Sequence, residues 1–197
     1  MLKQLTCLLF CGAFFSPYNY AHNAQKNYTA EQVIEYLGLK GHVEGGFYKR
    51  TYQANNTATI TTQKGERFSM TSIFYLLSAE SPIGHFHLNR SDIVHYFQLG
   101  DPITYYLIDP NGVLSTVVMG TNLAAGEQLQ VTVPGGTWKA SKIVPGGHHG
   151  YSLISEAVSP GFDFADMTLG YHDLLITQFP QHKALIMQLS PALPPEK

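Results

Sequence analysis

The chain has 197 residues, of which 44% are hydrophobic and 13% are charged, and this balance argues against a disordered protein. Its formal net charge of -2 gives no basis for a polyanionic partner such as a nucleic acid. Length and composition therefore predict one globular domain, and the abundance of Tyr, Phe, Gly and Pro favours strands joined by turns over a helical bundle.

The first element is an apolar run of 11 residues, Leu5–Phe15, which follows one lysine and precedes a Ser-Pro turn. A run of this length is too short to span a bilayer comfortably and is typical of the core of a secretory signal peptide. We expect a signal peptide over residues 1–21, with cleavage near Ala21 or Ala24. The mature protein would then be exported, periplasmic or secreted, and free of the membrane. Acylation at Cys11 and an uncleaved buried segment are the alternatives.

The mature protein is expected to contain no cysteine, because Cys7 and Cys11, the two cysteines of the chain, both lie in this leader. This excludes a disulfide scaffold, a thiol nucleophile and a cysteine-ligated metal.

A short helix is predicted at the start of the mature domain, because residues 29–32 (TAEQ) form a capping box and apolar residues follow at helical spacing up to Gly38. The period then changes to two, and from Tyr171 onward it returns to 3.6, which predicts two further short helices outside the strands. A single domain is expected over 25–192, with a frayed tail over 193–197. Nine strands are predicted between the helices, at 46–53, 69–77, 85–88, 93–99, 104–108, 113–119, 127–133, 138–144 and 151–158. Short strands separated by turns rich in Gly, Pro, Asn and Asp indicate an antiparallel sandwich or barrel.

The stretch GHFHLNRSDIVHYFQLGDP, residues 84–102, holds the residues best suited to metal binding. On a strand, His85 and His87 would share a face, and Asp92 would add a carboxylate, which together resemble a two-histidine, one-carboxylate site for a divalent metal. The alternative is that the imidazoles hydrogen-bond inside a polar cavity. His95 is either a third nitrogen ligand or a core histidine bonded to a backbone carbonyl, and the second reading is favoured.

Two other stretches contribute candidate pocket residues. In EGGFYKR, residues 44–50, Glu44 and Arg50 are expected beside a barrel mouth, where Arg50 would bind a carboxylate or phosphate of a ligand; an Arg-Glu ion pair at a dimer edge is the alternative. Trp138 and Lys139 are adjacent on a predicted strand and therefore face opposite ways. If Lys139 points into the cavity, Trp138 packs outside, beneath the helices or in a dimer interface.

Residues 84–102 resemble the first motif of the cupin superfamily, with Gly84, the two histidines of the pair and Gly100 in matching places. The stretch VPGGTWKAS, residues 133–141, resembles the second motif. There Lys139 replaces the histidine that is the fourth metal ligand, and its ammonium group would oppose a divalent cation.

The chain is also similar, over nearly all of its mature length, to an uncharacterised family of single-domain, sugar-epimerase-like cupins. Departures are Val43 where that family usually has Pro, Ile93 where many members have Glu, and Lys139 where Gln is common. The resemblance implies a double-stranded β-helix, or jelly-roll barrel, with a ligand cavity, and implies a homodimer. The matching stretches are 42–52, 71–77, 85–92, 100–109, 133–141, 151–169 and 179–186.

Three functions are consistent with these residues and motifs. The first is a protein that binds a small sugar-like or carboxylated ligand without an obligatory metal, using His87 and Lys139 as general base and acid in epimerase- or isomerase-type chemistry. The second is a metal-dependent enzyme, and the third is a noncatalytic binding module. The first is ranked highest. Its ligand-binding residues are predicted to be Glu44, Arg50, His85, Asp92 and His95, and the metal ligands of the second to be His85, His87 and Asp92.

Overall fold

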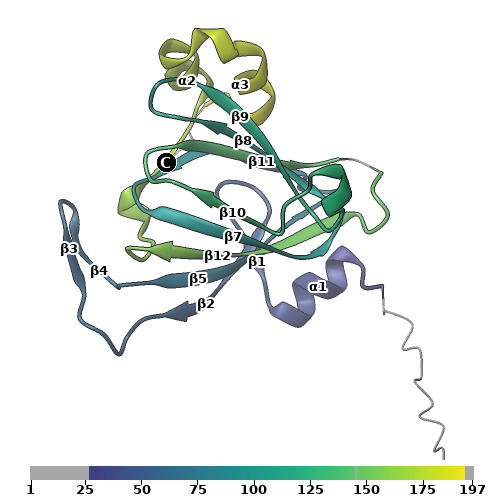
Figure 1. Ribbon diagram of the computed structural model, residues 1–197, viewed down its shortest axis with the longest axis horizontal. Coiled ribbons are helices and arrows are strands. Elements are labelled where there is room, and N and C mark those ends of the chain that lie inside the picture. Colours follow the sequence, from purple (N-terminus) through teal and green to yellow (C-terminus); the bar gives the residue numbers. More distant parts are fainter. Residues whose placement is uncertain (1–26, 145, 194–197) are drawn as a thin grey trace, which may run out of the picture.

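The computed structural model describes residues 27–144 and 146–193, so the predicted signal peptide lies outside the described residues. Two antiparallel sheets face each other in a jelly-roll arrangement, as predicted (Figure 1). The first sheet has the order β1 (Lys40–Gly41), β2 (Phe47–Gln53), β5 (Thr71–Ser78), β12 (Tyr151–Ser159), β7 (Asp92–Gly100) and β10 (Gln130–Val133). The second has the order β13 (Met167–Leu169), β6 (Ile83–Asn89), β11 (Trp138–Ile143), β8 (Ile103–Ile108) and β9 (Leu114–Met119).

Helix α1 (Ala30–Leu37) opens the domain and lies on the outer face of the six-stranded sheet, as seen in Figure 1. The Thr29 side chain accepts a hydrogen bond from the backbone N–H of Gln32, and the Gln32 side chain accepts one from the backbone N–H of Thr29, so the predicted capping box is present. Gly38 ends the helix in a left-handed conformation at φ 63°. The apolar side of α1 packs through Val33 against Leu76 and Leu153.

The main core fills the space between the two sheets. Strands β5, β12 and β10 contribute one side of it and strands β8, β9 and β11 the other, with Leu77, Ile103 and Met119 fully buried at the centre. Burial of these inward-facing apolar side chains holds the two sheets together. The polar cavity described below lies beside them.

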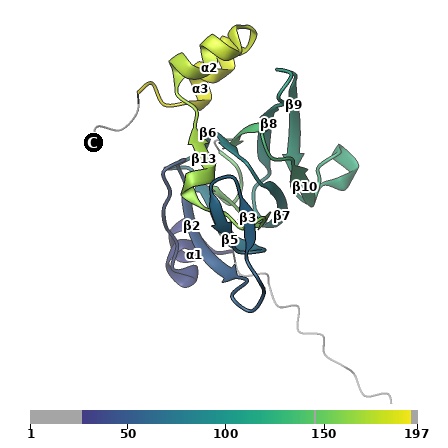
Figure 2. The same ribbon diagram turned by 90° about the vertical axis from the view of Figure 1, so that its left-hand side faces the viewer.

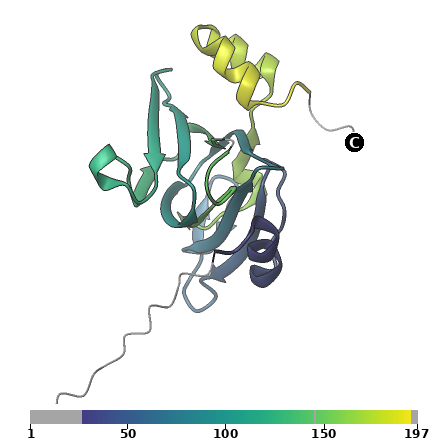
Figure 3. The same cartoon turned by 90° about the vertical axis from the view of Figure 1, so that its right-hand side faces the viewer.

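A second apolar layer lies outside the five-stranded sheet. Helices α2 (His172–Gln178) and α3 (Lys183–Leu189), joined by the 3-10 turn η3 (Pro180–His182), cover strands β6 and β11. Trp138 is buried beneath them with Phe86 and Leu175, which agrees with the outward direction predicted for Trp138. Figure 3 shows these helices and α1 on opposite sides of the strands. Within the described residues, every helix is too short or too polar to cross a membrane.

A hairpin of β3 (Ile60–Thr62) and β4 (Gly65–Arg67) stands apart from the two sheets at the left of Figure 1, and in Figure 2, seen from that side, it lies in front of the strands. It contacts the segment that follows β12, where a 3-10 turn, η2 (Phe164–Asp166), lies before β13. The buried Arg67 guanidinium pairs with the Asp166 carboxylate, and the Lys64 ammonium donates a hydrogen bond to the Ala165 carbonyl. These contacts fix the segment 162–166, called the rim loop below.

All nine predicted strands are confirmed, with ends that shift by up to three residues. The prediction missed four strands of two or three residues, namely β1, β3, β4 and β13, and the three 3-10 turns η1 (Leu123–Ala125), η2 and η3. Two or three residues are too few to establish a hydrophobic period, so only pairing with a neighbouring strand defines these four strands.

Candidate functional site

A cavity of about 540 Å³ opens between the two sheets on the side of the rim loop. Buried or half-buried polar residues form its inner wall, and basic and aromatic residues form its mouth. The inner wall includes His42, Glu44, Tyr75, His87, Asn89 and Glu156. The mouth includes Lys40, Lys49, Arg50, Phe162, Asp163 and Phe164.

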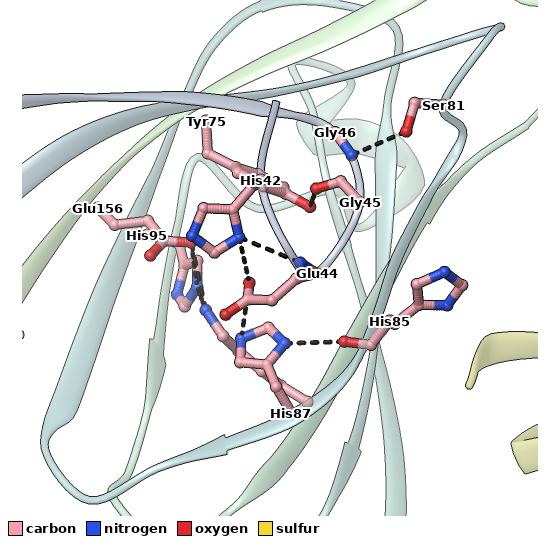
Figure 4. A network of polar contacts seen from close by, with 11 residues as sticks. His42, Glu44, Gly45, Gly46, Tyr75, Ser81, His85, His87, His95 and Glu156 are labelled. Atoms are coloured by element: carbon pink, nitrogen blue, oxygen red, sulfur yellow. Dashed lines mark hydrogen bonds and ion pairs between the residues drawn. The ribbon is translucent and has the colours of Figure 1, made fainter. Parts of the chain in front are cut away.

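Glu44 reaches the inner wall because the loop between β1 and β2 folds into the sandwich. Gly45 and Gly46 have positive φ angles of 92° and 68°, and a Cβ on Gly45 would lie 2.2 Å from the backbone oxygen of Ile83. The hydroxyl of Tyr75 donates a 2.9 Å hydrogen bond to the Gly45 carbonyl, which fixes the loop from inside (Figure 4). Glu44 is consequently buried, with 7% of its surface exposed.

His85 and His87 point in different directions, so the prediction that they share a face is wrong. Lys139 of β11 pairs with His87 of β6 and Ser141 pairs with Gly84, which leaves one extra residue in β6 as a β-bulge. The bulge reverses the alternation: His87 enters the cavity, and His85 lies on the outer side, where its Nδ1 is 3.3 Å from the Leu189 carbonyl oxygen of α3. Figure 4 shows the His85 ring directed away from the other histidines.

A group of three buried side chains lies behind the inner wall. His95 of β7 is paired in register with Glu156 of β12, and Lys139 reaches both from the opposite sheet. The Lys139 Nζ lies 2.8 Å from His95 Nε2 and 3.2 Å from Glu156 Oε1. Within the described part of the chain, Glu156 is the member of this group that lines the cavity. His95 is fully buried, as favoured for a core histidine, but its Nε2 contacts the Lys139 and Glu156 side chains. It therefore lies behind the cavity wall and not among the residues that line it.

The hydrogen bond at His87 Nδ1 and the burial of both side chains together indicate a proton on Glu44. His87 Nδ1 lies 2.8 Å from the His85 carbonyl oxygen, which can only accept, so Nδ1 carries the hydrogen. In the neutral imidazole Nε2 is then an acceptor, and it lies 3.2 Å from Glu44 Oε2. Burial raises the pKa of Glu44 to about 8 and lowers the pKa of His87 well below its ordinary value. The pair is thus a neutral carboxylic acid that donates to a neutral imidazole.

Glu156 has the opposite protonation state. Burial by itself would raise the pKa of Glu156, but the Lys139 ammonium and the His95 ring outweigh burial and lower that pKa instead. The carboxylate therefore stays ionised and forms a buried ion pair with Lys139. Two buried carboxyl groups on one inner wall thus differ in charge, because one has a lysine at hydrogen-bond distance and the other has a neutral histidine.

His42 completes the inner wall beside Glu44. Its Nδ1 accepts a 3.3 Å hydrogen bond from the backbone N–H of Glu44, and its ring meets Tyr48 edge to face at 4.4 Å between centroids. Burial is the main cause that lowers the pKa of His42 from 6.5 to about 4, and Lys139 adds to it. His42 is accordingly neutral at physiological pH, and the Phe164 ring of the rim loop stacks over it.

Asp92 does not join the histidines. It is exposed at the start of β7, where its Oδ1 accepts a 2.7 Å hydrogen bond from the Gly135 backbone N–H. The predicted metal set of His85, His87 and Asp92 is therefore dispersed, and in residues 27–144 and 146–193 no group of three or more metal-binding side chains is found. The donor set also does not fit a divalent cation, because the Lys139 ammonium is directed at the nitrogen of His95 that such a cation would need.

Arg50 lies at the mouth of the cavity, as predicted, but apart from Glu44. Its guanidinium donates a 3.1 Å hydrogen bond to the Phe162 carbonyl of the rim loop and a 3.0 Å bond to the Gln53 side chain. Glu44 contacts His42 and His87 instead, so the alternative of an Arg-Glu ion pair is not what the described residues show.

Sequence reasoning missed four residues of the inner wall, namely His42, Tyr75, Asn89 and Glu156. The signal for Glu156 was present, because it is the only charged residue in the predicted strand over 151–158 and therefore stands within a buried run. No comparable signal marks His42, Tyr75 or Asn89. His42 reaches the site through the inward fold of the loop between β1 and β2, whereas Tyr75 lies within β5 and Asn89 at the end of β6.

Comparisons with known proteins agree with this architecture. An uncharacterised protein of Saccharomyces cerevisiae is 38% identical over 151 residues, which cover 71% of this chain and 74% of the yeast protein. A hypothetical protein from Leishmania major has a solved structure that is similar with a TM-score of 0.77 at 35% identity, covering 83% of this chain and 99% of that one. A protein of Shewanella oneidensis gives a TM-score of 0.74 at 38% identity, with the same coverage.

The family model described as "Cupin superfamily (DUF985)" matches residues 31–170. The matched range begins in α1 and ends directly after β13, so it contains both sheets and every residue of the inner wall. The sequence match, the two facing sheets and the solved relatives lead to one conclusion: the chain belongs to the DUF985 family of the cupin superfamily.

Proposed function

We propose that the cavity binds a small polar ligand, sugar-like or carboxylated, and that Glu44 and His87 exchange a proton with it in epimerase- or isomerase-type chemistry. One observation carries the proposal: Glu44 Oε2 lies 3.2 Å from His87 Nε2, while the other nitrogen of His87 is held by the His85 carbonyl. This places a proton donor and a proton acceptor next to each other in the wall of a cavity.

The pKa of Glu44 suits this role. A carboxyl group with a pKa of about 8 is still mostly protonated at neutral pH and can give its proton to a ligand with a small free-energy cost. When Glu44 gives its proton to the ligand, His87 Nε2 is free to accept the proton that leaves the ligand carbon, and transfer of that proton from His87 back to Glu44 restores the starting state. The predicted general base, His87, is kept in the proposal, and Glu44 replaces Lys139 as the general acid.

Lys139 has a positioning role in this proposal. Its Nζ is bound to His95 and Glu156, and the Glu156 carboxylate is the member of the group that lines the cavity. An anion that faces the ligand accepts hydrogen bonds from ligand hydroxyl groups, and Lys139 keeps it ionised. A ligand with several hydroxyl groups is therefore a better match for this wall than an apolar one.

The test is hydrogen exchange at carbon. Purified protein is incubated in D₂O with a panel of aldoses, ketoses and 2-hydroxy acids, and loss of the C–H signal next to the carbonyl or carboxyl carbon is followed by NMR. We expect exchange with the wild-type protein and a loss of at least about a hundredfold in Glu44→Gln and His87→Gln, in line with the contribution of a general acid or base.

His85→Gln is the matched control, because it makes the same change two residues away on the outer side of β6. It should keep the exchange rate of the wild type. If ligands raise the melting temperature of the wild type but no probe exchanges, the chemistry is wrong and the protein is a noncatalytic binding module.

We further propose, from the leader and the family resemblance, that the protein is exported and forms a homodimer. Mass spectrometry of the native N-terminus tests cleavage near Ala21 or Ala24. Sedimentation analysis of the mature protein tests the dimer, and a monomer at micromolar concentration would contradict it.

A further inference from the structure

Two cations point toward the mouth of the cavity from neighbouring strands. Lys40 of β1 pairs in register with Tyr48 of β2, and Arg50 follows Tyr48 by two residues, so the three side chains are on the same face of the sheet. Lys40 and Arg50 are therefore diagonal neighbours, roughly 7–8 Å apart at their backbones. Side chains of their length can both reach one group bound between them.

The charge of the mouth is not balanced by the acids that line the cavity. Glu44 is protonated, and Glu156 is neutralised by Lys139. Asp163 is the remaining acid, and its Oδ1 caps the rim loop by accepting a hydrogen bond from the Ala165 backbone N–H. Lys40 and Arg50 therefore give the mouth a positive charge, although the chain as a whole carries -2. Lys49 alternates to the other face of β2, where its ammonium donates a 2.8 Å hydrogen bond to the Leu37 carbonyl.

We propose that the ligand carries an oxyanion, a phosphate or a carboxylate, which Lys40 and Arg50 hold at the mouth while its hydroxylated part extends toward Glu44 and His87. This inference rests on the proposed function and adds the class and orientation of its ligand. The orientation follows from charge: Lys40 and Arg50 attract an anion to the mouth, whereas the inner wall has no unpaired cation, because the Lys139 ammonium is paired with the Glu156 carboxylate.

The middle of the cavity suits the remainder of such a molecule. Tyr48 and Phe164 both contact the His42 ring, and Phe164 keeps 53% of its surface exposed at the opening. Aromatic faces of this kind pack against the C–H face of a sugar ring without a hydrogen-bond requirement. A ligand with an anionic end and a hydroxylated end would thus meet a basic, an aromatic and an acidic zone in that order.

The test uses simple anions as probes. The melting temperature of the purified protein is measured in increasing inorganic phosphate and, separately, increasing acetate, against chloride at equal ionic strength and pH. We expect a saturable rise with at least one of the two anions, and the anion that acts identifies the phosphate or carboxylate class. Lys40→Gln should weaken the apparent affinity about tenfold or more, the value of a charge-assisted hydrogen bond.

Lys183→Gln makes the same charge change on exposed α3, far from the cavity, and should leave the response unchanged. Arg50→Lys keeps the charge and should retain most of the effect, whereas Arg50→Gln should lose it. The inference is overturned if neither anion exceeds chloride, or if the Lys40 and Lys183 variants respond alike. Because Glu44→Gln should still respond to the anion, this result is independent of the exchange test of the proposed chemistry.

Discussion

At the scale of single residues, the site depends on the different states of Glu44 and Glu156. Both carboxyl groups are buried to a similar extent, with 7% and 8% of their surfaces exposed. Glu156 has the Lys139 ammonium 3.2 Å away and stays charged, whereas Glu44 faces a neutral imidazole and keeps its proton. Desolvation acts on both, and the neighbouring charge decides the outcome.

The protonation of Glu44 should appear in the pH dependence of stability. Its pKa is raised from 4.5 to about 8 in the folded protein, so the folded state binds more protons than the unfolded state between these values. The stability that the folded state gains from holding this proton is fully present below pH 4.5 and is lost as the pH rises toward 8. Between pH 6.5 and 8, the free energy of unfolding should fall by roughly 1–2 kcal/mol, as measured by urea denaturation.

The side chain in Glu44→Gln cannot titrate. The free energy of unfolding of this variant should therefore not show the fall between pH 6.5 and 8 that the wild type shows. Below pH 6.5 the buried histidines act in the opposite direction, because the pKa of His42 is lowered from 6.5 to about 4 and its stabilising effect grows as the pH rises through that window. Above pH 6.5, the pH dependence of stability therefore reports the effect of Glu44 without the opposing effect of His42. Equal slopes in both proteins there would show that Glu44 is ionised in the folded state.

At the scale of elements, two irregularities create the inner wall. The bulge in β6 separates His87 from His85, and the loop between β1 and β2 carries Glu44 into the sandwich. Both need backbone that departs from a regular strand, and the loop needs glycine because Ile83 approaches Gly45 too closely for a side chain.

Gly45→Ala should therefore destabilise the protein and displace Glu44. The substitution combines a φ of 92° with a contact at 2.2 Å to a backbone oxygen, which cannot move aside as a flexible side chain can. We expect a loss of at least about 2 kcal/mol in urea denaturation. Gly41→Ala is the control in the same segment, because a Cβ there meets nothing within 4 Å, and it should stay within about 0.5 kcal/mol.

At the scale of the whole molecule, the helical layer and the site lie on opposite sides of the five-stranded sheet. The helices α2 and α3 cover the outer side of the five-stranded sheet, whereas the cavity opens between the sheets on the other side of β6 and β11. The bulge is a place where the two sides meet, since His85 contacts α3 while the next inward residue, His87, contacts Glu44.

Removing apolar contact from the helical layer should lower stability and leave the cavity intact. Leu175 is fully buried against Phe86 and Trp138, and Leu175→Ala should cost about 2–5 kcal/mol. Its neighbour Leu174 is 45% exposed, and Leu174→Ala should change stability by no more than about 0.5 kcal/mol. Both variants should keep the fall in stability above pH 6.5 that Glu44 causes, and its disappearance in Leu175→Ala would show that the layers are coupled.

The sequence by itself determined the longer elements, because hydrophobic period, capping residues and turn residues are local signals, and it indicated the family through its resemblance to the two cupin motifs. Nine strands, three helices and the outward direction of Trp138 were predictable on that basis. The site was predictable only in part: Glu44 and Arg50 line the cavity, as does His87, whereas His85 and Asp92 do not. Alternation predicts direction only in a regular strand, and one extra residue in β6 reverses it. Tertiary structure alone brought Glu156 to Lys139 and Glu44 to His87, because charges and protons are set by neighbours distant in sequence.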